Sequence, residues 1–241
     1  RVDPEIQMIA DKALASAIKM QNAKGGIAIV ADPMTGRILA VSNIDKTKGM
    51  KKFWALSETM EPASMIKPIV AAQAIENGQT TAQEKHNCEN GSYKYGDEIY
   101  HDWKDAGWPE LTTEETIGVS SNICAMKIGE KVGARGLRKM LVDFGFGPEG
   151  TTKTFPAAKA GRLPPAEDTK HPKIVPYVSA GFGFRTTPLE LVQAYGAIAN
   201  GGHLMMPIAA DAKDASQKVV RRVLSEASAN QVKEILRQVV L

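Results

Sequence analysis

The sequence has few of the residues that would mark a metal-binding or nucleic-acid-binding protein. Its two cysteines, Cys88 and Cys124, have neither a CxxC spacing nor a nearby histidine placed for a metal, so we expect separate thiols, with Cys124 as a small buried hydrophobe. Four histidines are scattered along the chain and predict no metal site. The net charge of +3 is small and no basic run occurs, which argues against nucleic-acid binding.

Long hydrophobic runs are also absent. No stretch of about 18 apolar residues occurs, so the sequence shows neither a transmembrane helix nor a signal peptide. The chain begins without Met and stops at Leu241 inside a helical pattern that has no C-cap signal. We therefore expect a fragment or processed product, and a missing N-terminus leaves room for an anchor.

Periodicity predicts a mixed fold with many helices. Two apolar runs over 27–31 and 37–42 flank a five-residue turn and predict a β-hairpin. The breaker-rich segment 145–176 predicts a long ordered loop. Helices are expected over 4–20, after EPASMIKP to about 77, and over about 113–132. A separate helix is expected in ARGLRKMLVDFG, ending near 144, and the last two in TPLELVQAYGAIANG and SANQVKEILRQVVL. Because a two-stranded hairpin alone is marginal in water, we expect the native polypeptide to supply more strands.

The segment EPASMIKP carries the first candidate for chemistry. Proline is tolerated only in the first turn of a helix, so Pro68 predicts that Ser64, four residues earlier, lies at the helix start. Lys67 then follows one turn later on the same face. A hydroxyl at the positive end of a helix with an amine beside it is suited to nucleophilic catalysis. The alternative is that Ser64 is only a helix cap.

SxxK is a weak motif alone, and a second copy, Ser16-Ala17-Ile18-Lys19, is interpreted as a surface pair within the first helix. A further polar motif, Ser120-Ser121-Asn122, interrupts a helical apolar pattern. It could hold site residues or be a helix–loop junction. The other SxN triplet begins at Ser228, which we expect to cap the last helix.

The ordered set EPASMIKP, SSN and SAGFGFRTTPLELVQAYGAIANGG resembles the transpeptidase domain of class B penicillin-binding proteins. The segments DPEIQMIADKAL, ADPMTGRILAVSN, DFGFGPEG and GRLPP are similar to that domain as well, so the resemblance runs from about residue 2 to the end. It implies an α/β fold of the α+β type, related to β-lactamases, with a central antiparallel sheet between helical regions. It implies no cofactor.

The resemblance also implies roles for four residues. Ser64 would be the nucleophile, and its backbone N–H would be an oxyanion-hole donor. Lys67 would be the base, kept neutral by burial and nearby positive charge. Ser120 would relay a proton to the leaving amine, and Asn122 would hydrogen-bond the substrate and Lys67.

One family motif is missing. No Lys-Thr-Gly or Lys-Ser-Gly occurs in the sequence, since Lys153-Thr154 is followed by Phe155 and the only Thr-Gly lies in the hairpin turn. We therefore expect residues 1–241 to be one transpeptidase domain that is incomplete at its C-terminus, without its N-terminal anchor and pedestal domain. Ala63 stands where the family usually has glycine, and we expect it and the neighbouring Met65-Ile66 to be compatible with a helix.

The resemblance implies a serine-type peptidoglycan D,D-transpeptidase that cross-links stem peptides and is acylated by β-lactams. Its place would be outside the cytoplasmic membrane, held by a transmembrane segment, with cell-wall synthesis or division proteins as partners. The stretch IYHDWKDAGWPELT favours the division-type subgroup. The alternatives are a β-lactamase or β-lactam sensor, which shares SxxK and SxN, and an inactive scaffold, which the missing motif favours.

Overall fold

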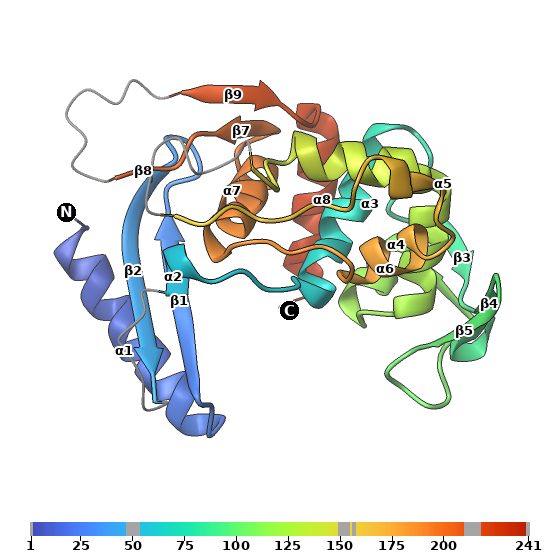
Figure 1. Ribbon diagram of the computed structural model, residues 1–241, viewed down its shortest axis with the longest axis horizontal. Coiled ribbons are helices and arrows are strands. Elements are labelled where there is room, and N and C mark those ends of the chain that lie inside the picture. The colour runs from blue at the N-terminus through green and yellow to red at the C-terminus, as the bar shows by residue number, and fades with distance from the viewer. Residues whose placement is uncertain (1, 47–53, 149–154, 156–157, 210–217, 240–241) are drawn as a thin grey trace.

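The computed structural model describes residues 2–46, 54–148, 155, 158–209 and 218–239 (Figure 1). Its elements form two regions that lie side by side. One is a small sheet with helices on either side, and the other is a helical region built around a buried central helix. Across the described ranges, no helix is long and apolar enough to cross a membrane.

The predicted hairpin is the main part of the sheet. Strands β1 (Gly25–Ala31) and β2 (Arg37–Asp45) pair antiparallel, with Ile29 opposite Val41. Asp32 fixes the turn between them by accepting hydrogen bonds from Thr35 Oγ1 at 2.7 Å and Met34 N at 2.8 Å. Strand β8 (Ile208–Ala209) adds a short parallel pairing to β2. The hairpin prediction is confirmed.

Helices cover both faces of this sheet (Figure 1). Helix α1 (Pro4–Met20) packs on β1 and β2 through Ala10, Leu14 and Ile18. Helix α7 (Pro188–Ala199) lies against β1 from the other side and starts with a capping box of Thr187 and Glu190. The central sheet between helical regions agrees with the predicted fold class.

The helical region surrounds α3 (Lys67–Glu76), which is buried over nearly all of its length because its Ile, Val and Ala side chains face neighbours on every side. Its neighbours are α4 (Thr113–Gly118), α5 (Asn122–Asp143), α6 (Ile174–Ala180) and α8 (Glu226–Gln238). Short paired strands lie at the margins: β3 (Lys85–Asn87) with β6 (Glu110–Thr112), β4 (Ser92–Tyr95) with β5 (Glu98–His101), and β7 (His203–Met205) with β9 (Val219–Arg222). Single turns of helix complete the described elements: α2 (Trp54–Ser57), η1 (Ala63–Ile66), η2 (Glu89–Gly91) and η4 (Glu167–Lys170).

Several predicted boundaries were wrong. The helix expected over 113–132 is broken at 119–121, where α4 ends and α5 begins. The last helix starts at Glu226 with Ser225 as its N-cap, so Ser228 is not the cap. Helix α6 begins within the segment expected to be a loop, and most of the short strands were not predicted because three- and four-residue runs carry little periodicity.

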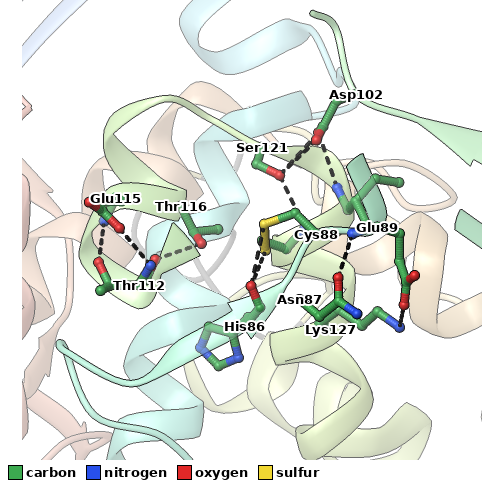
Figure 2. The surroundings of a disulfide bond; sticks show 12 residues. His86, Asn87, Cys88, Glu89, Asp102, Thr112, Glu115, Thr116, Ser121 and Lys127 are labelled. Atoms are coloured by element: carbon green, nitrogen blue, oxygen red, sulfur yellow. Dashed lines mark hydrogen bonds and ion pairs between the residues drawn. A yellow bond between two sulfur atoms is a disulfide. The ribbon is translucent and has the colours of Figure 1, made fainter. Parts of the chain in front are cut away.

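The prediction of two separate thiols was also wrong. Cys88 and Cys124 form a disulfide whose Cα atoms are 4.9 Å apart (Figure 2). Both residues are fully buried, as predicted for Cys124, and they pack with Leu111 in a small cluster of their own. The bond joins the segment after β3 to the first turn of α5, so it fixes the start of that helix against the margin of the domain.

Candidate active site

Ser64 lies in the single 3-10 turn η1, directly before α3, and it is exposed. The Lys67 N–H donates to the Ser64 carbonyl, so this carbonyl needs no bond from position 68, where proline has no N–H. The prediction that Pro68 places Ser64 at the start of a helix is confirmed, with the refinement that the first turn is a 3-10 turn. Tyr195 of α7 fixes the turn by donating to the Met65 carbonyl at 2.8 Å.

The backbone before Ser64 is left-handed. Ala63 has φ +50°, so the expectation that alanine fits a helix here was wrong, and glycine would be the less strained residue. Ala63 N donates to Gly181 O at 3.0 Å, and a Cβ at Gly181 would lie 1.9 Å from Ala63 O. The end of α6 thus lies directly against the turn that carries Ser64, at a distance that only glycine allows.

Lys67 is the buried amine of the site, with 2% of its surface exposed. Its Nζ donates to Ser120 O at 2.7 Å, Ser120 Oγ at 3.1 Å and Asn122 Oδ1 at 2.8 Å. Burial lowers the pKa of Lys67 to about 8, as expected. The expected effect of a nearby positive charge was wrong, because the charge that acts on Lys67 is the negative one of Asp102, which raises the pKa. A neutral amine therefore becomes accessible just above neutral pH, which is what a general base requires.

Residues 119–121 form the break between α4 and α5, so the helix–loop junction and the polar site are the same feature. Ser120 has φ +57°, which turns its carbonyl and hydroxyl toward Lys67. Ser121 is the N-cap of α5 and accepts from Cys124 N at 3.1 Å. Asn122 then begins the helix, with its amide oxygen on Lys67 and its Nδ2 donating to His101 O at 3.1 Å.

Asp102 was missed in the sequence. Its carboxylate accepts from Ser121 Oγ (Figure 2). It also accepts from Asn122 N and Ile123 N, so it holds the start of α5 from the end of β5. A single aspartate in a polar segment has no spacing that would single it out. The only available signal was its place within IYHDWKDAGWPELT, the aromatic-containing stretch before the SSN motif.

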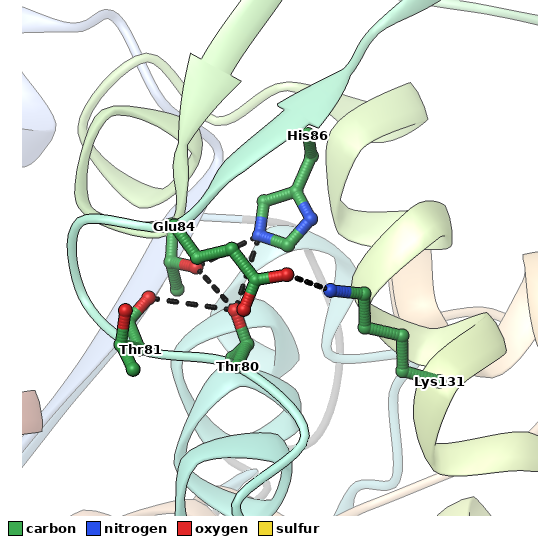
Figure 3. A network of polar contacts seen from close by, with 6 residues as sticks. Thr80, Thr81, Glu84, His86 and Lys131 are labelled. Carbon is green, nitrogen blue, oxygen red and sulfur yellow. Dashed lines mark hydrogen bonds and ion pairs between the residues drawn. The ribbon is translucent and has the colours of Figure 1, made fainter.

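A second buried polar cluster lies away from Lys67 and joins the loop after α3 to β3, α4 and α5 (Figure 3). His86 Nε2 lies 2.9 Å from Thr113 Oγ1 and 3.3 Å from Thr80 Oγ1, and burial lowers the pKa of His86. Glu84 and Lys131 form an ion pair beside it. Every partner of this histidine is internal, so the cluster is a structural one. Within the described ranges, no group of three His, Cys, Asp or Glu side chains could hold a metal ion.

The competing copies of the motifs are structural. Ser16 and Lys19 are both exposed on α1, as expected of a surface pair. Ser228 lies in the first turn of α8, where its N–H donates to Ser225 Oγ at 3.2 Å. The site is thus built by the one SxxK and the one SxN copy that meet in space, Lys67 with Ser120 and Asn122. Lys153-Thr154, which was rejected as the third motif, lies outside the described residues.

Comparison with known proteins finds relatives that all come from one family. The family described as penicillin binding protein transpeptidase domain matches residues 26–241. The chain is 28% identical over 250 residues to a probable peptidoglycan D,D-transpeptidase PenA of Neisseria meningitidis, covering 98% of this chain and 41% of that protein. It is 30% identical over 258 residues to the penicillin-binding protein PbpB of Mycobacterium tuberculosis, covering 99% of this chain and 37% of the relative.

Solved structures show the same fold. The transpeptidase domain of penicillin-binding protein 3 from Burkholderia pseudomallei matches with a TM-score of 0.87 and 30% identity, over all of this chain and 70% of the other. Penicillin-binding protein 3 of Mycobacterium tuberculosis, in complex with ampicillin, matches with a TM-score of 0.84 and 29% identity, over all of this chain and 56% of the other. The chain spans about two-fifths of the length of the curated relatives. It belongs to the penicillin-binding protein transpeptidase family, among relatives of class B.

Proposed function

We propose that this protein is a peptidoglycan D,D-transpeptidase that works through an acyl-enzyme on Ser64. The observation that carries the proposal is the environment of Lys67. This amine is buried, it contacts both Ser120 and Asn122, and it lies one turn after an exposed serine. An amine with a pKa of about 8 in such a place can accept a proton and return it.

In the first half of the reaction, Ser64 Oγ attacks the carbonyl of the penultimate D-Ala of a stem peptide. Lys67 takes the hydroxyl proton, and the backbone N–H of Ser64 stabilises the oxyanion of the tetrahedral intermediate. The C–N bond then breaks, and Ser120 relays the proton from Lys67 to the departing amine of the terminal D-Ala. The hydrogen bond between Lys67 Nζ and Ser120 Oγ, 3.1 Å long, supports this relay.

In the second half, the amine of a neighbouring stem peptide attacks the acyl-enzyme and releases Ser64, which forms the cross-link. The proton path runs in reverse, with Lys67 again as the base. Asn122 holds the substrate backbone. Its Nδ2 group carries two hydrogens and His101 O accepts from this group, which leaves one hydrogen for a peptide carbonyl.

β-Lactams would acylate Ser64 as substrate mimics. Ampicillin and aztreonam are bound in the solved Mycobacterium tuberculosis relatives, which supports this expectation for the present chain. Stable adducts, rather than steady hydrolysis, separate a transpeptidase from the β-lactamase alternative.

The proposed place of action is the extracytoplasmic side of the inner membrane, with an N-terminal transmembrane anchor. The buried Cys88–Cys124 disulfide supports it, because disulfides persist in oxidising compartments such as the periplasm. The proposed partners are peptidoglycan stem peptides together with cell-wall synthesis or division proteins.

The absence of a Lys-Thr-Gly motif from these 241 residues favours one rival, a scaffold that binds partners without catalysis. We propose that the domain is completed by a further C-terminal segment that supplies this motif. Protein from the complete gene, incubated with a stem-peptide donor and an acceptor amine, should release D-Ala and form a cross-linked product. The Ser64→Ala variant should do neither. A wild-type protein that releases no D-Ala would support the scaffold.

A further inference from the structure

Asp102 is a buried carboxylate at the edge of the site, with 9% of its surface exposed. It directly follows β5 and faces the N-terminus of α5. Ser121 Oγ donates to its two oxygens at 3.1 and 3.0 Å (Figure 2). Ile123 N donates at 3.2 Å, and Asn122 N donates as well. The carboxylate thus accepts hydrogen bonds from three consecutive residues, Ser121, Asn122 and Ile123, of which the first two belong to the SxN motif.

Ser121 caps α5 by accepting from Cys124 N, and Asp102 accepts from the two preceding N–H groups, those of Asn122 and Ile123. A neutral acceptor could also satisfy these N–H groups, so capping alone does not require a charged side chain here. Burying a charged carboxylate costs free energy unless hydrogen bonds or a charge of opposite sign compensate for the lost hydration. A positively chargeable group contacts the other side of the Ser120-Ser121-Asn122 motif from Asp102.

That group is the amine of Lys67. Lys67 binds Ser120 and the amide oxygen of Asn122, whereas Asp102 binds Ser121 and the backbone of Asn122. The three residues of the motif therefore lie between an amine and a carboxylate. The negative charge of Asp102 opposes the effect of burial on the pKa of Lys67.

We propose that Asp102 is a positioning residue of the acyl-transfer site, which orients Asn122 toward Lys67 and stabilises the positive charge that Lys67 acquires when it takes the proton of Ser64. The inference rests on the proposed function. The proton moves from Ser64 Oγ to Lys67 Nζ and onward through Ser120, and none passes to Asp102. The carboxylate supplies a fixed negative charge close to the developing ammonium.

The sign of the effect follows from electrostatics. The negative charge of Asp102 raises the pKa of Lys67, and burial lowers it by more. Removal of the charge lowers the pKa of Lys67 further, so the base becomes available at lower pH but is weaker. We expect the rising limb of the acylation rate to move to lower pH by about one unit in Asp102→Asn. The plateau rate should fall, because the ammonium has lost its partner.

The test is the rate of benzylpenicillin acylation against pH, measured on protein from the complete gene by intact mass. Asp102→Asn keeps an acceptor for Asn122 N and nearly the same shape, and a melting curve checks that it folds. Asp105→Asn is the matched control, since it removes an exposed carboxylate from the same loop. Asp102→Glu keeps the charge and should keep the wild-type midpoint.

A midpoint that moves in Asp102→Asn, and not in Asp105→Asn or Asp102→Glu, supports the inference. An Asp102→Asn protein that has the wild-type midpoint and only a lower melting temperature overturns it and leaves a structural cap. If the wild-type protein is not acylated at any pH, the proposed function itself fails. The two failures are therefore distinguishable.

Discussion

Lys67 Nζ lies 2.8 Å from Asn122 Oδ1, although the two residues are 55 positions apart in the sequence. The contact exists because α3 packs against α5, so that the first residue of each helix faces the other. Each helix carries one motif at its N-terminus. The packing of the buried helix α3 against α5 thereby places an amine beside its polar partners.

The titration of Lys67 should appear in the kinetics. With a pKa of about 8, lowered by burial, the amine is protonated at acidic pH and cannot accept the Ser64 proton. We expect the second-order rate of β-lactam acylation to rise with pH through about 8 and then to level off. Lys67→Arg should lose about 10²–10⁴ in rate at every pH, because arginine keeps the charge but does not deprotonate. A rate that is flat between pH 6 and 10 would contradict this role.

A negative charge added at position 122 should raise the pKa of Lys67, whereas removal of the Asp102 charge should lower it. Asn122→Asp places a carboxylate on Lys67 Nζ, which raises the pKa of the lysine. We expect the rising limb to move to higher pH by about one unit or more, with slower acylation at pH 7. Asn122→Ala is the control: it removes the hydrogen bond without adding charge, so it should lower the rate without an upward shift. Equal profiles for the two variants would speak against the electrostatic account.

The contact between Gly181 and Ala63 should be sensitive to a single methyl group. Gly181→Ala puts a Cβ at 1.9 Å from Ala63 O at a residue with φ +88°. We expect the free energy of unfolding to fall by about 3 kcal/mol or more, and acylation to fall with it, because the turn carrying Ser64 must move. Gly78→Ala is the matched control, since Gly78 also has positive φ but no atom lies within 4 Å of its Cβ position. It should cost only about 1–2 kcal/mol in urea denaturation and leave acylation intact.

The Cys88–Cys124 disulfide closes a loop of 36 residues next to the SxN motif. Its removal should lower the free energy of unfolding by about 4 kcal/mol in the chain-entropy account. Urea denaturation with and without a reductant measures this difference. A Cys88→Ser/Cys124→Ser double variant should match the reduced wild type and show no response to reductant. Identical midpoints for the oxidised and reduced wild type would show that the bond contributes nothing.

The sequence was sufficient for the long, periodic elements. The hairpin, α1, α3 and α7 follow from alternation, helical spacing and the position of Pro68. Ser64, Lys67, Ser120 and Asn122 were predicted by their motifs, and the structure brings Lys67 together with the last two. Spacing alone could not tell these copies from the structural ones at Ser16 and Ser228.

Other features depend on tertiary contacts that no local pattern encodes. The disulfide joins two cysteines that have no recognisable spacing. Asp102 acquires its role only when β5 brings it to the start of α5. The left-handed Ala63 results from the close approach of Gly181, 118 positions away in the sequence, and propensity for alanine predicts helix instead.

The central claim, that Ser64 is an acyl acceptor, is tested most directly by intact-protein mass spectrometry before and after incubation with benzylpenicillin. We predict a single adduct on the protein from the complete gene, stable over the time of the measurement and absent in Ser64→Ala. An unmodified wild-type mass, or an adduct that persists in Ser64→Ala, would contradict the account.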